Sequence, residues 1–263
     1  MLSPRAIYGE IFRNDEAFRL FCSIAASGES QGGWENGRIA ALVPESLGDL
    51  APKIARHGAD EEKHGRIFRA LLRKRNLSPV PVPADVDYTM RLEREGIGLA
   101  HSKLRAAKPL TEADIIAYLA HSRVTEQRAA EQMRSLRRYS SANSNVSRAV
   151  TVISADEDKH LAYCHEELLR LGAAGHRRSI ESVLRATARA EIAVYRDVSK
   201  AVIARLGLTL GWSRAKRVIL ARGIDAVYLY ERLGGWHRMV TLRMPAQRDP
   251  LGTSVPAGAR HGG

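Results

Sequence analysis

The sequence predicts an all-α protein, an antiparallel four-helix bundle with a long crossover plus a C-terminal helical extension. The composition, with 6% aromatic residues and abundant Ala, Leu, Arg and Glu, is typical of helices. Apolar residues recur with helical periodicity. An internal repeat indicates the hairpin architecture: residues 59–64 and 155–160 nearly match, and their histidines are 160 − 64 = 96 residues apart. We therefore expect two copies of one helical hairpin.

The bundle is expected within residues 14–172. The Pro-rich stretch 77–83 should form a stiff, extended connector. Thr111 is a plausible N-cap for the third long helix, and Gly172 suits a C-terminal cap for the fourth. In order, the predicted helices are 14–41, 47–75, a short crossover helix at 85–101, a third from Thr111 and a fourth from Ser144 to Gly172.

The C-terminal third is basic. Residues 173–263 hold 16 Lys/Arg against 6 Asp/Glu, a net charge of 16 − 6 = +10. Most of the net charge of the whole protein, which is +12, therefore lies in this third. Residues 173–244 should form a helical extension, with helices near 179–206 and 213–233, and the Gly- and Pro-rich segment 245–263 should be a disordered tail. Two interpretations stay open: a docked helix with solvated Arg side chains, or a surface for an acidic partner such as acyl carrier protein, tRNA or anionic lipid. Exposed helical faces also allow a homodimer.

The hydropathy pattern and the number of cysteines exclude several classes of protein. No apolar stretch follows a basic start and no run of 18 apolar residues occurs, so we expect a cytoplasmic protein. Two cysteines cannot form a disulfide framework or a four-thiolate iron site. We expect Cys22 and Cys164 to be buried, separate thiols.

Acidic residues and histidines interrupt the apolar stripes at mid-length. On the second helix they are Glu61 and His64, and on the fourth Glu157 and His160. A bare carboxylate in a core costs several kcal/mol unless something compensates, and metal cations are the usual compensation. A single Glu-x-x-His on a helix is usually a surface pair. Two copies, each on an apolar stripe, indicate a metal site.

The other two helices supply one Glu each, as a two-metal bundle site requires. Glu29 and Glu126 lie on the inward stripes, and they are 126 − 29 = 97 residues apart, close to the repeat offset. Asp60 and Asp156 are natural hydrogen-bond acceptors for the ligand histidines, unless they face water. The predicted metal ligands are Glu29, Glu61, His64, Glu126, Glu157 and His160.

These residues carry a resemblance to known proteins. Residues 28–31 match the first-helix ligand motif of rubrerythrins. Residues 59–65 and 155–160 resemble the Asp-Glu-x-basic-His motifs of acyl-carrier-protein desaturases and related oxygenases, and residues 125–129 are a looser match to the third-helix motif. Over residues 14–172 the chain therefore resembles the ferritin-like superfamily of di-iron carboxylate proteins.

The resemblance implies two iron ions, with manganese or a mixed Fe/Mn pair as alternatives, and oxygen or peroxide as reactant. It also implies an external electron donor. The chain departs from rubrerythrins in two respects. It lacks the cysteines of their rubredoxin-like centre, and Ala129 stands where they carry a second Glu.

Three functions remain open at this point. The leading one is a non-haem di-iron oxidoreductase that activates oxygen, of the oxygenase, oxidase or desaturase type, with no catalytic residue beyond the metal ligands. The second is a rubrerythrin- or ferritin-like ferroxidase or peroxide-reducing protein. The third is a non-enzymatic helical binding protein.

Overall fold

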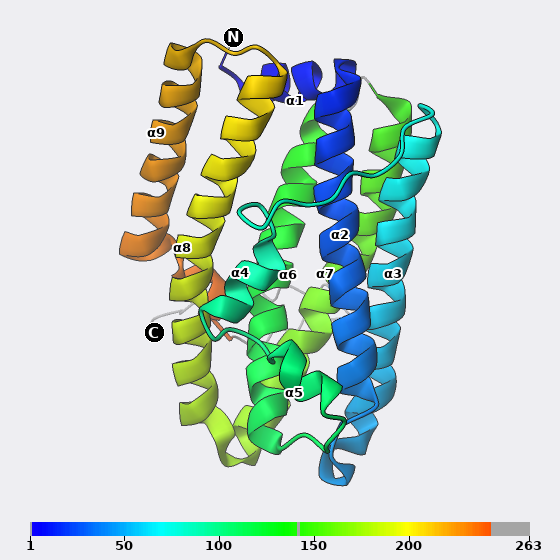
Figure 1. Ribbon diagram of the computed structural model, residues 1–263. Coiled ribbons are helices and arrows are strands. Elements are labelled where there is room, and N and C mark those ends of the chain that lie inside the picture. The colour runs from blue at the N-terminus through cyan, green and yellow to red at the C-terminus, as the bar shows by residue number, and fades with distance from the viewer. Residues whose placement is uncertain (1, 141–142, 243–263) are drawn as a thin grey trace, which may run out of the picture.

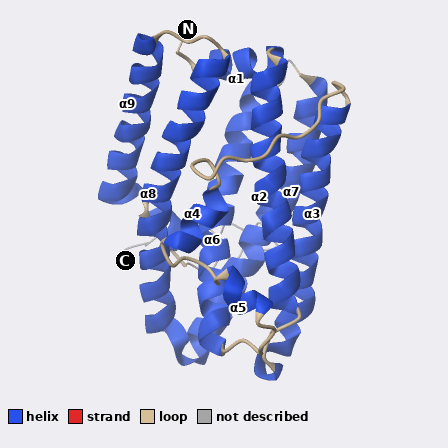
Figure 2. Ribbon diagram, viewed as in Figure 1, coloured by secondary structure: helices blue, strands red, loops and turns tan. Residues whose placement is uncertain are grey.

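The computed structural model describes residues 2–140 and 143–242 and folds them into helices, with no strand among these residues (Figure 2). The all-α class predicted from the sequence is confirmed. In chain order the elements are α1 (Pro4–Arg13), α2 (Asp15–Ala40), η1 (Glu45–Leu50), α3 (Ala51–Arg73), α4 (Tyr88–Arg94), α5 (His101–Arg105), α6 (Glu112–Tyr139), α7 (Ser144–Leu171), η2 (Gly172–His176), α8 (Arg177–Thr209), α9 (Arg214–Tyr230), η3 (Glu231–Gly235) and α10 (His237–Val240).

Four long helices lie side by side as two antiparallel hairpins (Figure 1). Helices α2 and α3 form the first hairpin, and α6 and α7 form the second. The connection between them passes in front of α2 in the view of Figure 1. It carries two short helices, α4 and α5, where the sequence predicts a single helix over 85–101, because residues 95–100 form a turn and loop instead.

Polar side chains cap the starts of three long helices: Asn14 caps α2, Thr111 caps α6 and Asn143 caps α7. Thr111 and Asp114 form a reciprocal capping box, which confirms Thr111 as the predicted N-cap of α6. Helix α7 ends at Leu171 with Gly172 as its C-cap, as predicted, but Gly172 keeps a right-handed φ of −61°, and the chain continues through the wide turn η2 into α8. The residue with the left-handed backbone is Gly175, whose φ of 105° only glycine adopts readily. The left-handed glycine therefore lies three residues after the C-cap of α7, inside η2.

Helix α1 lies outside the region predicted to be helical, which begins at residue 14. Its start has a clear signal, since Ser3 accepts a hydrogen bond from the backbone of Ala6 and Pro4 occupies the first turn. Ile11 and Phe12 are buried in the same core as the upper ends of α2 and α6. The segment preceding α2 thus closes one end of the bundle.

Two apolar clusters fill the interior, one toward each end of the four long helices. Along α3, Ile54 belongs to one cluster and Phe68 to the other; along α7, Cys164 and Ile153 do the same. The cluster at the α1 end also contains Cys22. Both cysteines are buried and free, as predicted. Between the clusters each helix presents polar side chains, and that layer holds the candidate site.

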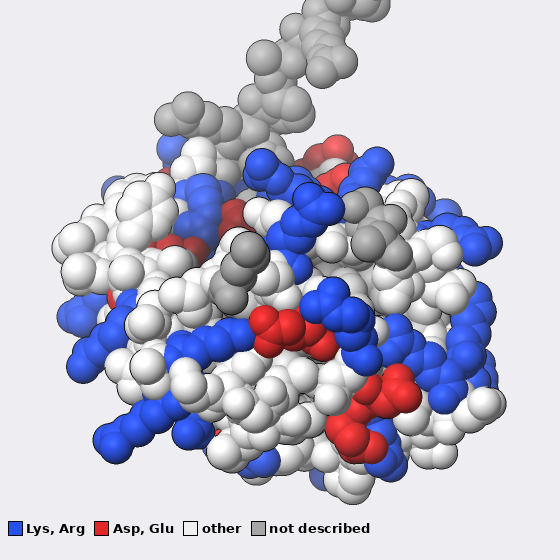
Figure 3. Space-filling model, turned by 90° about the horizontal axis from the view of Figure 1, so that it is seen from above, with Lys and Arg blue, Asp and Glu red and all other residues white. Residues whose placement is uncertain are grey.

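The C-terminal third contributes to the core as well as to the surface. Ile180, Leu184 and Ile192 of α8 are buried in the cluster far from α1. Helix α9 packs beside α8 and has no buried residue of its own. Figure 3 shows Lys and Arg side chains scattered over one end of the molecule rather than gathered in a single patch. The predicted disordered tail, 245–263, lies outside the described residues.

Within residues 2–140 and 143–242, none of the helices is both long enough and apolar enough to cross a bilayer.

Candidate metal centre

Helix geometry brings the polar layer together. On α3, residues 57, 61 and 64 share one face because they are four and three positions apart. Helix α7 presents residues 157 and 160 in the same way, and α2 and α6 contribute one Glu each. The structure brings all six predicted ligands into one region, together with a seventh residue, His57.

The side chains form two overlapping groups, in each of which the potential ligand atoms lie within 4.8 Å of one another. Glu61 belongs to both groups. One group is Glu29, Glu61, His64 and Glu157, and the other is His57, Glu61, Glu126 and His160.

The first group is centred on Nδ1 of His64. This atom lies 3.3 Å from Glu29 Oε2 and 3.3 Å from Glu157 Oε1. The His64 side chain is fully buried, and the exposed fractions of the Glu29 and Glu157 side chains are 15% and 4%. Three elements, α2, α3 and α7, therefore meet at one imidazole nitrogen.

The second group is arranged around Glu61 and Glu126. His57 Nε2 lies 3.2 Å from Glu61 Oε1 and 3.1 Å from Glu126 Oε1. His160 Nδ1 lies 3.5 Å from Glu61 Oε1 and 3.8 Å from Glu126 Oε2. Both His160 Nδ1 and Glu126 Oε2 are buried and lack a hydrogen-bond partner. Unpaired polar atoms of this kind are expected where a cation completes the site.

The pKa values of the buried glutamates show why their negative charges need compensation by cations or protons. Burial raises the pKa of Glu29 to about 8, with the Glu61 carboxylate adding to the effect. Burial, reinforced by Glu126, also raises the pKa of Glu157 well above its usual range. Burial alone would raise the pKa of Glu126 too, but His57 and His160 hold it well below its ordinary value. Without cations the acids must share protons, so protons and metal ions compete for the same atoms.

The outward nitrogens of two histidines face aspartates of the opposite hairpin. His64 Nε2 lies 3.3 Å from Asp156 Oδ2, and His160 Nε2 lies 3.5 Å from Asp60 Oδ2. Lys63 Nζ lies 2.5 Å from Asp60 and 2.6 Å from Asp156, so it joins the two carboxylates. The aspartates are placed to accept a hydrogen bond from the Nε2–H of each imidazole, which leaves Nδ1 free to bind a metal.

His57 is the site residue that the sequence interpretation leaves out. It lies on the inward stripe of the second helix, but its repeat counterpart, at 57 + 96 = 153, is Ile153, so the repeat gives no hint of it. Its position four residues before Glu61 on a buried face is the signal that was available. Its Nδ1 lies 3.0 Å from the hydroxyl of Tyr163, which lies 2.7 Å from that of Tyr118. This pairing turns Nε2 toward the acids.

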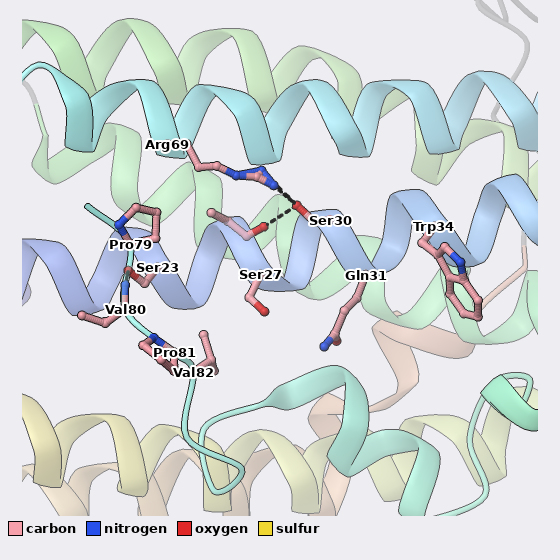
Figure 4. A pocket seen from close by; sticks show the side chains of 11 residues that line it. Ser23, Ser27, Ser30, Gln31, Trp34, Arg69, Pro79, Val80, Pro81 and Val82 are labelled. Carbon is pink, nitrogen blue, oxygen red and sulfur yellow. Dashed lines mark hydrogen bonds between the residues drawn. The ribbon is translucent and has the colours of Figure 1, made fainter. Parts of the chain in front are cut away.

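A cavity of about 890 Å³ adjoins the polar layer. Its wall includes Glu29, Glu61, Glu126 and Glu157, and it extends between α2, α6, α8 and α9. A separate pocket of about 420 Å³ lies on another face of α2, under the connector at Pro79 (Figure 4). Ser30 there accepts a hydrogen bond from Arg69, and none of the candidate ligands lines this pocket. Of these two spaces, only the larger one reaches the candidate metal centre.

Comparison with known proteins adds nothing to this picture: no family model matches the sequence, and no curated protein or solved structure shows significant similarity to it.

Proposed function

We propose that this protein is a di-iron oxidoreductase of the ferritin-like superfamily, in which the four-helix bundle of α2, α3, α6 and α7 holds two iron ions that activate oxygen. The observation that carries the proposal is that Glu61 belongs to both ligand groups. Two cation positions that share a carboxylate are the arrangement expected of a two-metal carboxylate site.

The donor set fits this assignment. It contains carboxylates and imidazoles and no thiolate, which suits iron or manganese better than a closed zinc site. Bound iron would supply the redox chemistry with oxygen, using electrons from an external donor. The protein's own contribution is to hold the ligands, to fix each histidine through Asp60 or Asp156, and to exclude bulk water with the apolar clusters.

The large cavity favours an oxygenase, oxidase or desaturase over a ferroxidase or peroxide reductase. Ferrous iron and hydrogen peroxide are small and polar, so neither requires an adjacent apolar space of about 890 Å³. An organic substrate does. We therefore place an organic compound, rather than iron or peroxide, as the molecule oxidised.

The test is metal loading followed by oxygen consumption. Anaerobic addition of ferrous iron to the full chain should give two ions per chain by elemental analysis. Glu61→Gln should lose both, because Glu61 is common to both groups. Glu62→Gln is the matched control, since its side chain is 59% exposed on the same helix. A wild-type protein that folds but stays metal-free would favour the non-enzymatic binding protein. Rapid peroxide turnover without organic substrate would favour the ferroxidase or peroxide-reducing protein.

A further inference from the structure

The pocket of about 420 Å³ between α2 and the Pro-rich connector, here called the connector pocket, has a separate chemistry (Figure 4). Ser27 and Trp34 line it from α2, and because they are seven positions apart they share one face of that helix. Residues 79–82 line it from the connector, and Arg69 reaches it from α3. None of the residues that line it belongs to either ligand group of the candidate metal centre.

The connector is attached to α2 beside this pocket. Nε of Arg19 donates a hydrogen bond to the carbonyl oxygen of Ser78 at 2.7 Å, and the backbone N–H of Val80 donates one to Oγ of Ser23 at 3.0 Å. Prolines at alternate positions of 79–83 stiffen the backbone that follows. The wall formed by the connector is therefore in place before any ligand binds.

The charge of the connector pocket comes from Arg69. Of the described residues that line the pocket, Arg69 alone is charged, and it is half-buried. Its guanidinium donates hydrogen bonds to the neutral hydroxyl of Ser30, and within residues 2–140 and 143–242 no carboxylate forms an ion pair with it. Arg66, three residues earlier on the same helix, does pair with a carboxylate, that of Glu62. A half-buried guanidinium without a counter-ion favours an anionic ligand.

The hydrogen-bonding groups of the pocket suit one carboxylate. Ser23 and Ser30 already donate their hydroxyl hydrogens to carbonyl oxygens of α2, at 2.7 Å each. The hydroxyl of Ser27 has no partner among the described residues, so it can donate to a ligand. The guanidinium fork of Arg69 and this hydroxyl match the two oxygens of a carboxylate, whereas a phosphate dianion would keep half of its charge uncompensated.

The rest of the wall is apolar. It consists of the prolines and valines of residues 79–82, Ala26 and the indole ring of Trp34. Trp34 is 36% exposed, and its ring makes an edge contact with the His101 ring at a centroid distance of 4.8 Å. Proline and tryptophan rings offer flat surfaces to an aromatic ligand. The volume lies near the lower end of the roughly 300–1,000 Å³ typical of small-molecule pockets, which suits a ligand of one or two rings.

We propose that the connector pocket binds a small aromatic monocarboxylate, with the carboxylate paired to Arg69 and the ring between the connector and Trp34. The four glutamates of the candidate metal centre line the other, larger cavity, where they would repel the same anion. Binding in the connector pocket needs no metal, so this proposal stands or fails separately from the di-iron proposal.

The test measures binding of 2-naphthoate, the neutral 2-naphthamide and 2-naphthyl phosphate to the metal-free full chain at pH 7.5, by equilibrium dialysis. 2-Naphthoate should bind at least tenfold more tightly than either analogue. Arg69→Gln should weaken 2-naphthoate binding at least tenfold and leave 2-naphthamide binding unchanged, because the amide carries no charge to pair. Arg66→Gln is the matched control: it removes the same charge from a side chain of α3 that is 64% exposed, and it should change neither affinity.

A second variant fills the pocket. Ser27→Phe should weaken binding of 2-naphthoate and 2-naphthamide at least tenfold. Gly37→Phe, at an exposed position of the same helix where a Cβ meets nothing within 4 Å, should weaken neither. Unchanged 2-naphthoate binding in Ser27→Phe with wild-type helical circular dichroism would overturn the proposal, because the ligand would then bind elsewhere.

Three further outcomes would also overturn it. The first is binding of the amide or the phosphate as tight as that of 2-naphthoate. The second is unchanged 2-naphthoate binding in Arg69→Gln. The third is an equal loss of 2-naphthoate and 2-naphthamide binding in a folded Arg69→Gln protein, which would mean that Arg69 shapes the wall instead of pairing with the carboxylate.

Discussion

Nε2 of His64 on α3 lies 3.3 Å from Oδ2 of Asp156 on α7. The relationship is reciprocal, because His160 on α7 faces Asp60 on α3. Each hairpin thus orients the histidine of the other, and the 96-residue repeat appears in space as a pair of crossed contacts. Neither hairpin alone could hold its imidazole in this orientation.

Asp156→Asn should weaken iron binding about 10- to 100-fold, because an amide, which can donate as well as accept a hydrogen bond, no longer enforces the required histidine tautomer. Iron titration of the metal-free protein measures the effect. Asp158→Asn is the control, since Asp158 is exposed on the same helix. Asp156 also contacts Lys63, so urea unfolding of the metal-free variant reports any structural loss separately. Equal iron affinity in the two variants would contradict this role.

His57 gives a sharper prediction about stoichiometry. It belongs to only one of the two ligand groups. His57→Ala should therefore reduce iron from two ions to one per chain, while Glu61→Gln removes both. Tyr163→Phe, which deletes the hydroxyl 3.0 Å from His57 Nδ1, should keep both ions with lower affinity. Two tightly bound ions in His57→Ala would mean that His57 is not a ligand.

The six residues predicted as ligands, which the structure brings into one region, could be identified from the sequence because two local constraints coincide. Helical periodicity assigns Glu61 and His64 to a buried face, and the repeat assigns Glu157 and His160 to the same position on another helix. His57 escapes this logic because its counterpart is Ile153. A ligand present in one copy only leaves no repeat signal.

The cavity could not be predicted, since it depends on how α8 and α9 pack against the hairpins. No local pattern in residues 177–230 sets that distance. The same holds for Arg128, which belongs to the third-helix motif but makes its hydrogen bonds to Glu191 and Glu231, 63 and 103 residues later. Long-range contacts of this kind are fixed by packing rather than by propensity.

The ion cluster around Arg128 should be important for stability. Burial opposes its charge, but the hydrogen bonds that Arg128 donates to Glu191 and Glu231 raise the pKa of Arg128 above its ordinary value. Arg128→Met would leave the buried Glu191 with only the Tyr88 hydroxyl as a partner and Glu231 with only Arg238, and should cost about 3–5 kcal/mol in the free energy of unfolding. Arg137→Met, at an exposed position of α6, should change it by less than about 0.5 kcal/mol. Similar urea midpoints for the two variants would show that the carboxylates find other partners.

Glu10 links the first helix of the chain to α9. Its carboxylate accepts hydrogen bonds from Lys216 at 2.8 Å, and these bonds lower the pKa of Glu10 below its ordinary value of 4.5. A carboxyl with a lowered pKa in the folded state contributes stability above pH 4.5, and this is lost as the pH falls through the lowered value. The difference in stability between wild type and Glu10→Gln should thus shrink on acidification from pH 6 to pH 3. Because the pair is partly exposed, the difference should stay below about 1 kcal/mol. A difference that grows toward pH 3 would contradict the assignment.

The close approach of α2 and α3 sets the geometry between Glu29 and His64, and it depends on two glycines. A Cβ at Gly58 would lie 3.0 Å from the carbonyl oxygen of Gly33, and a Cβ at Gly33 would lie 3.1 Å from that of Gly58. Gly58→Ala should therefore destabilise the fold by about 1–3 kcal/mol through overpacking, despite the better helix propensity of Ala. Because the helices must separate, iron affinity should fall as well.

Gly37→Ala is the control for this pair, since a Cβ there meets nothing within 4 Å. It should stabilise the protein by about 0.5–1 kcal/mol and leave iron affinity unchanged. Thermal unfolding and iron titration of the two variants give both quantities. If Gly58→Ala raised stability as Gly37→Ala does, the backbones would have room to spare, and the spacing of α2 and α3 could not be what holds Glu29 against His64.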